Sequence, residues 1–304
     1  MFNSSRPALP QAYWRRCRLL LSLLPLLLTA CASVPPVAPP AAAAQAGPPI
    51  RFLLTFDDGP SAREGWNPTS SILDDLAVNP IQPGIKALFF VQTRAVNGGG
   101  TVLGRSILRR EQADGHLLGF HTATPRHSNH RTMEPQQFES SLQDGIADLS
   151  AITGVAPTLV RPPFWNYDAR TFAIYQQHGL RVLLTTLSAN DGKIYGFHAS
   201  PTRRSNLLKH LAAQADAIRA GTLPQVDGVT PIVVTFHDVN DYTARHMQEY
   251  LQLLLDVAHE LQLPVASKPF YDERAALERA ALAGTVTDGS ATPQLPGFWS
   301  WLWN

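Results

Sequence analysis

The stretch Ile50–Pro60, IRFLLTFDDGP, is the most informative part of the chain, because an apolar strand runs directly into two aspartates and a Gly-Pro break. Side chains alternate between the two faces of a strand, so Asp57 and Asp58 are expected to point in different directions. One carboxylate can then bind a cation while the other handles a proton. Taken alone, Asp-Asp-Gly-Pro also fits a plain strand end, because these residue types favour turns.

Strand-like and helix-like patterns alternate along the rest of the chain. Apolar runs typical of strands occupy 50–56, 86–91, 117–121, 157–161, 181–187, 231–237 and 263–267. Helical periodicity occupies 135–152, 168–178, 203–220 and 242–262. Alternation of this kind implies parallel strands joined by crossovers. It predicts an α/β fold, a distorted (β/α) barrel of about seven parallel strands, with reactive groups at the carboxyl ends of the strands.

Several of these strand-like runs end in residues that can carry chemistry. They are GFHTATPRHSNH, LVRPPFW, LLTTLSANDG and VVTFHD, in addition to LTFDDGP. Together they resemble the NodB-type polysaccharide deacetylases, metal-dependent hydrolases that remove acetyl groups from sugar polymers. The resemblance extends from about Ile50 to Lys268, and we expect a catalytic domain over residues 50–285. An open doubly wound sheet is the alternative fold, but its ligands gather at one switch point.

The resemblance implies a divalent metal, with zinc as the first expectation, bound by Asp58 and two histidines. The family spaces its histidines His-Ser/Thr-x-x-His, whereas His121-Thr122 is followed here by proline at position 125. A two-residue insertion would restore the pattern with His127, and His130 is the alternative third ligand. Three protein ligands would leave room for water and substrate, as a catalytic site requires.

The resemblance also implies how an amide would be hydrolysed. Asp57 would act as the general base and Arg161 would fix its orientation. His237 would be the general acid that protonates the departing amine, and Asp191 would raise its pKa. The backbone N–H of Phe164 would meet the negative charge that develops on the acetyl oxygen.

Aromatic side chains offer platforms for a sugar face. Trp66 and Trp165 are the candidates for substrate binding, although aromatic residues more often serve the core. Gly192 stands where the family usually has a tryptophan, and Trp165 could fill that role from another strand. Residues 286–304 form an aromatic tail that we expect to pack over the barrel or its membrane-facing base, with glycan binding as the alternative use.

The beginning of the chain has the pattern of a secretion signal. Arginines precede the apolar run LLLSLLPLLLTA, which Cys31 follows directly, and the segment resembles a bacterial lipoprotein signal. We therefore expect a signal peptide over 1–30, lipidation of Cys31, and an Ala/Pro-rich tether over 31–49. The protein would be anchored by lipid in the cell envelope, on the periplasmic side of the outer membrane. An ordinary cleaved signal is the alternative.

The charge balance argues against nucleic acid as a partner. The formal net charge is +1 over 304 residues, which gives no electrostatic reason to bind a polyanion. The resemblance described above implies a metal-dependent hydrolase that removes N-acetyl groups from a cell-envelope or extracellular polysaccharide. The alternatives are an O-acetyl esterase, a catalytically impaired glycan-binding lipoprotein, and a glycoside hydrolase with two carboxylates and no metal.

Overall fold

A parallel sheet forms the centre of the fold. The computed structural model describes residues 47–191, 193–194, 197–198 and 200–289. Within them the sheet has eight strands in the order β5-β4-β3-β2-β1-β9-β6, with β10 paired to β1. Its strands are β1 (Ile50–Asp57), β2 (Leu88–Gln92), β3 (Leu117–Thr122), β4 (Leu159–Val160), β5 (Arg181–Val182), β6 (Leu187–Ser188), β9 (Thr230–His237) and β10 (Val265–Phe270). A separate antiparallel pair consists of β7 (Lys193–Ile194) and β8 (Phe197–His198).

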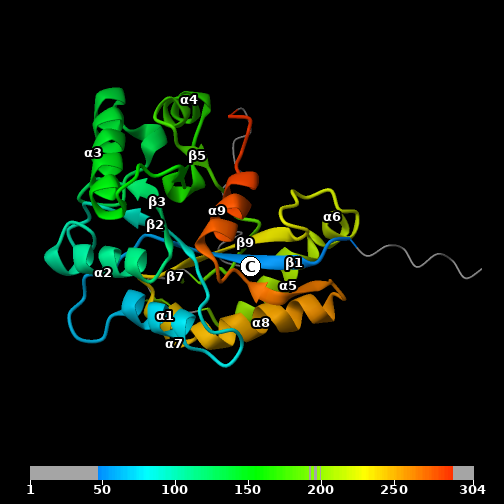
Figure 1. The fold of residues 1–304 in the computed structure, drawn as a ribbon. Coiled ribbons are helices and arrows are strands. Elements are labelled where there is room, and N and C mark those ends of the chain that lie inside the picture. Colours follow the sequence, from blue (N-terminus) through cyan, green and yellow to red (C-terminus); the bar gives the residue numbers. More distant parts are fainter. Residues whose placement is uncertain (1–46, 192, 195–196, 199, 290–304) are drawn as a thin grey trace, which may run out of the picture. The chain divides into compact units, whose positions relative to one another are not determined.

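Helices surround this sheet. They are α1 (Pro68–Ala77), α2 (Val102–Ala113), α3 (Pro135–Thr153), α4 (Ala169–Gln177), α5 (Arg203–Ala212), α6 (Ala215–Arg219), α7 (Asp241–Arg245), α8 (Met247–Glu260) and α9 (Arg274–Ala283), with 3-10 turns η1 (His130–Thr132) and η2 (Pro163–Trp165). In Figure 1, α1 and α8 lie below β1, whereas α3 and α4 lie at the upper left.

Alternation along β1 decides what each face of the sheet carries. Phe52, Leu54 and Phe56 belong to the larger hydrophobic cluster, which they share with residues of α1, α3 and α8. Leu53 points to the other face and belongs to a smaller cluster with residues of α9. Because the side-chain period is two, Thr55 and Asp57 follow Leu53 on that same face. The face that α9 covers at one end therefore carries polar groups at the carboxyl end of the strand.

The predicted distorted barrel is confirmed, with differences in its elements. Residues 181–187 belong to two strands rather than one, because β5 pairs with β4 whereas β6 pairs with β9. No ladder joins β5 to β6 in this described stretch, so the chain itself, rather than strand pairing, bridges the two edges of the sheet.

Helix boundaries also differ from the prediction. The pattern over 203–220 breaks into α5 and α6, and the pattern over 242–262 divides at His246, where ψ is 17° and φ is −120°. Helices α1, α2 and α9 were not expected. Asn67 and Thr101 cap the first two, because each side chain accepts a hydrogen bond from a backbone N–H three residues later.

The terminal predictions fall mostly outside the described residues. The signal over 1–30, Cys31 and most of the tether precede residue 47, and most of the aromatic tail follows residue 289. Among the helices of the described part, none is long and apolar enough to cross a membrane.

Candidate active site

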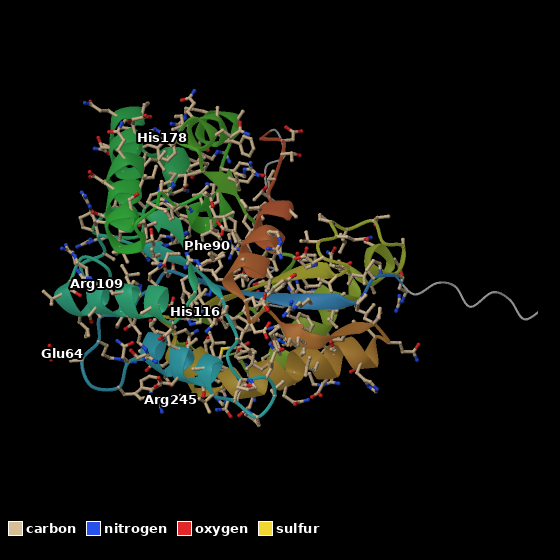
Figure 2. The ribbon with its side chains drawn as sticks, viewed as in Figure 1. Glu64, Phe90, Arg109, His116, His178 and Arg245 are labelled. Carbon is tan, nitrogen blue, oxygen red and sulfur yellow. The ribbon has the colours of Figure 1, made fainter. Side chains whose placement is uncertain are left out.

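Asp57 and Arg161 form a buried ion pair on the polar face of the sheet. Nη1 of Arg161 donates to Oδ1 of Asp57 at 2.9 Å, and both side chains are almost entirely buried. The same nitrogen donates to the hydroxyls of Thr55 and Thr235, at 2.6 and 3.0 Å. The guanidinium also lies 4.3 Å from the centre of the Phe90 ring, which Figure 2 shows in the middle of the molecule. These contacts fix the orientation of the Asp57 carboxylate.

Asp58 lies just beyond the strand and turns away from Asp57. Its φ of 75° is in the left-handed region, which a residue other than glycine seldom adopts. Oδ1 of Asp58 lies 3.2 Å from Nε2 of His121 and 3.5 Å from Nε2 of His127. The two Nε2 atoms are 3.2 Å apart.

The three ligand atoms fit one divalent ion. Ligands at about 2.0–2.1 Å from a tetrahedral ion lie about 3.3 Å from one another, and the observed separations of 3.2, 3.5 and 3.2 Å match that triangle. Two imidazoles and one carboxylate are also the donor set that a catalytic zinc site uses. This chain therefore carries an Asp/His/His site that could hold a metal.

Neighbouring groups orient both imidazoles. Nδ1 of His121 lies 2.7 Å from the carbonyl oxygen of Arg161. That nitrogen must then carry the proton, which leaves Nε2 available to a cation. The ring of His127 stacks on Phe164 with centroids 4.4 Å apart. The carbonyl of Pro125 accepts a hydrogen bond from the backbone N–H of Val96 at 3.1 Å, which helps to fix the loop between His121 and His127.

The other two histidines of this region lie elsewhere. His130 is fully buried, and its Nδ1 pairs with the Tyr175 hydroxyl at 2.7 Å, so the structure does not bring it to the candidate metal site. His116 precedes β3 at the opposite end from the site, and its Nδ1 accepts the N–H of Ala87 at 3.0 Å. Figure 2 labels His116. Burial lowers the pKa of each of these histidines to about 3, so both remain neutral parts of the core.

His237 and Asp191 form a second pair at the end of β9. Nδ1 of His237 lies 2.8 Å from Oδ1 of Asp191, while the His237 backbone N–H donates to Oδ2 at 2.8 Å. Thr243 also donates to Oδ2 at 2.6 Å. Burial opposes a charge on His237, but Asp191, with help from Asp58 and Asp57, raises the pKa of His237 to about 10. The imidazole is therefore an acid at neutral pH.

A groove of about 800 Å³ exposes this chemistry to solvent. Asp58, His127, His237 and Phe164 line it together with Gln92 and Arg63. Burial would raise the pKa of Asp58, yet the hydrogen bond of His121 and the charges of the surrounding histidines lower it below its usual range. The carboxylate at the groove is thus charged and ready to bind a cation.

The predicted aromatic platforms have different positions. Phe164 lines the groove and is 49% exposed, with a φ of 58°. Trp66 is 39% exposed, and the guanidinium groups of Arg63 and Arg245 lie 5.2 and 4.3 Å from the centre of its ring. Neither Trp66 nor the partly buried Trp165 is among the residues that line the groove.

Several residues that hold the site were not predicted from the sequence. Thr55 and Thr235 lie inside apolar runs, where a threonine is an ordinary strand residue. Gln92 and Thr243 touch Asp58 and Asp191 directly. The polar Gln92 at the end of the apolar run KALFFV was a signal, because polar residues at that end of a strand meet in the site.

Comparison with known proteins gives a consistent result. Residues 44–183 match the family model for polysaccharide deacetylase. A chitin deacetylase from Pestalotiopsis sp is 32% identical over 143 residues, covering 47% of this chain and 44% of the relative. A peptidoglycan-N-acetylglucosamine deacetylase from Listeria monocytogenes is 26% identical over 211 residues, covering 69% of this chain and 37% of the relative. This chain thus spans less than half the length of either relative.

A solved structure has the same fold. The chitin deacetylase from Colletotrichum lindemuthianum superimposes with a TM-score of 0.52 at 24% sequence identity, covering 74% of this chain and 92% of the other. The structural likeness supports the arrangement of strands and helices described above.

Proposed function

We infer that this chain belongs to the polysaccharide deacetylase family. We propose that it hydrolyses N-acetyl groups on a cell-envelope or extracellular polysaccharide. One observation carries the proposal: Asp57 and His237 are register partners on neighbouring parallel strands, beside the Asp58-His121-His127 triangle. Base, acid and metal ligands therefore meet at the carboxyl end of one sheet. Relatives that act on chitin and on peptidoglycan N-acetylglucosamine support a substrate of this class.

Asp58, His121 and His127 would hold the ion, and zinc suits two imidazoles and a carboxylate. A bound divalent ion supplies Lewis acidity, which polarises the acetyl carbonyl and makes water easier to deprotonate. The chain's own residues supply the proton transfers. Asp57, held through Oδ1 by Arg161, accepts a proton from the attacking water.

His237 completes the reaction from the neighbouring strand. As the C–N bond breaks, the nitrogen takes the electron pair and His237 gives it a proton. Water thereby contributes oxygen to acetate, and the sugar leaves as an amine. Asp191 keeps Nδ1 of His237 engaged at 2.8 Å, so the proton for the substrate comes from Nε2. The backbone N–H of Phe164, at the groove wall, would stabilise the developing oxyanion.

Acetate release from a panel of acetylated glycans tests the proposal. We expect release from N-acetylated chitin-like or peptidoglycan substrates, loss with a chelator, and recovery with zinc. Release that survives chelation would contradict the metal-dependent mechanism. Release from O-acetylated glycans alone would make the protein an esterase, because ester and amide hydrolysis pass through similar tetrahedral states.

We also propose that Cys31 is acylated and that the protein is anchored in the cell envelope. The apolar run LLLSLLPLLLTA before the cysteine supports this. Incorporation of a labelled fatty acid by the natural chain, and its absence from Cys31→Ser, is the expected result. Equal labelling of both proteins, or labelling of neither, would contradict the anchor.

A further inference from the structure

Asp58 has a backbone conformation that is uncommon for residues other than glycine. Its φ of 75° is unfavourable for a residue that carries a Cβ, and such conformations persist only where neighbouring groups impose them. The conformation matters because it turns the carboxylate away from Asp57 and toward His121 and His127. A small relaxation of this backbone would move Oδ1 off the position that completes the ligand triangle.

Gln92 contacts this segment at three points. The backbone N–H of Gln92 donates to the carbonyl of Gly59 at 2.8 Å. Its side-chain Nε2 donates to the carbonyl of Asp58 at 3.1 Å and lies 3.4 Å from Oδ1 of the same residue. Gln92 as a whole is 7% exposed, so water competes weakly for these groups. Gln92 is the last residue of β2, a strand paired with β1, and its position is therefore fixed by the sheet.

The chemistry of the carboxamide suits this role better than that of an apolar side chain. Its N–H group donates to the carbonyl of Asp58 and faces the ligand oxygen without bringing another negative charge near it. A methionine would fill similar space but would leave the Asp58 carbonyl without this donor. Partners that orient a metal ligand from outside typically change metal affinity or activity by about 10–100-fold when they are removed.

We propose that Gln92 is a positioning residue for the metal centre. Its carboxamide holds Asp58 in the left-handed conformation that aims Oδ1 at both imidazoles. This role rests on the metal site of the proposed function.

The test compares zinc affinity in Gln92→Met with that in a matched control. Gln82→Met removes another buried carboxamide, 9% exposed, whose hydrogen bonds go to the backbone of Phe270 rather than to the site. Zinc dissociation constants come from competition with a chromophoric chelator, and thermal unfolding of the metal-free proteins reports on the fold. We expect zinc binding to weaken about 10–100-fold in Gln92→Met and less than about twofold in Gln82→Met.

A second variant, with a shorter carboxamide, provides an independent check of the positioning role. Gln92→Asn retains a polar side chain but is too short to reach the Asp58 carbonyl, so it should weaken zinc binding as Gln92→Met does. Unchanged zinc affinity in the folded Gln92 variants would overturn the positioning role. Wild-type protein that binds zinc but releases no acetate would overturn the proposed reaction and leave this comparison intact, whereas wild-type protein that binds no zinc would overturn both.

Discussion

Asp57 and His237 are direct register partners on the adjacent parallel strands β1 and β9. Each is held by a buried residue that can carry the opposite charge, Asp57 by Arg161 at 2.9 Å and His237 by Asp191 at 2.8 Å. The sheet thus places a carboxylate and an imidazolium at the same level, with separate hydrogen-bonding partners. Such an arrangement lets one group accept a proton while the other donates one.

The two neighbouring aspartates should fail in different ways when they are altered. Asp57→Asn is expected to retain zinc but to lose at least about 10²-fold in the rate of acetate release, because it removes the base without touching the ligand triangle. Asp58→Asn should lose the ion, since a neutral amide is a much weaker ligand. Metal analysis beside rate measurements checks both. Equal zinc loss in the two variants would mean that the roles are misassigned.

Alanine substitutions of His127 and His130 should have different effects. His127→Ala removes one vertex of the ligand triangle, so zinc occupancy should fall sharply while the fold survives. His130→Ala should keep zinc but lose about 1–3 kcal/mol of unfolding free energy, because it removes a buried ring and the hydrogen bond to Tyr175. Zinc content and denaturant unfolding measure the two effects. Full zinc occupancy in His127→Ala would contradict the site.

The pH dependence of the rate should report on Asp191. Burial lowers the pKa of His237, but Asp191 outweighs it and raises the pKa to about 10. In Asp191→Asn the pKa of His237 should fall, and the alkaline limb of kcat/KM should move down by about one to three pH units. Glu139→Gln is the matched control, because it alters another histidine–carboxylate pair, with His178. An alkaline limb that stays in place in Asp191→Asn would remove His237 as the acid.

Much of the site could be predicted because the carboxyl ends of parallel strands meet. The position of Asp57, Arg161 and His237 at the ends of apolar runs indicated one shared end of the sheet, and the family resemblance implied their roles. The sheet register brings Asp57 opposite His237. Spacing favoured His127 over His130 but left both open, because loop geometry decides which imidazole turns toward Asp58. Only three-dimensional packing puts the ring of His130 against Phe120 and Phe138.

The other features that were not predicted from the sequence depend on contacts between residues far apart in the chain. A single apolar run at 181–187 gives no sign that β5 and β6 pair with opposite edges of the sheet. Nor does the sequence show that Gln92 reaches the carbonyl of Asp58, 34 residues earlier in the chain. Both depend on which strands become neighbours, and local patterns carry little of that information.

Asp238, the residue after His237, should make stability depend on pH. It is fully buried, and Oδ2 accepts a hydrogen bond from Thr69 at 2.7 Å, while Oδ1 has no partner within the described part of the chain. Burial raises the pKa of Asp238 to about 7, against a partial opposing effect of the Thr69 hydroxyl. Glu111, also fully buried, has a pKa raised by its burial and by Asp238.

The sign of the effect follows from the direction of this shift. A carboxyl whose pKa is raised on folding contributes stability that is fully present below its ordinary pKa of 3.8 and is lost as the pH rises through about 7.

Asp238→Asn keeps an acceptor for Thr69 but carries no charge. We therefore expect the unfolding free energy of the natural protein to fall relative to that of Asp238→Asn between about pH 4 and pH 7, by about 1.4 kcal/mol for each unit of pKa difference. Denaturant unfolding of the metal-free proteins across that range measures it, with Asp216→Asn on the exposed surface of α6 as the control. Parallel stability curves for the natural protein and Asp238→Asn would show that Asp238 is already charged in the folded state at low pH.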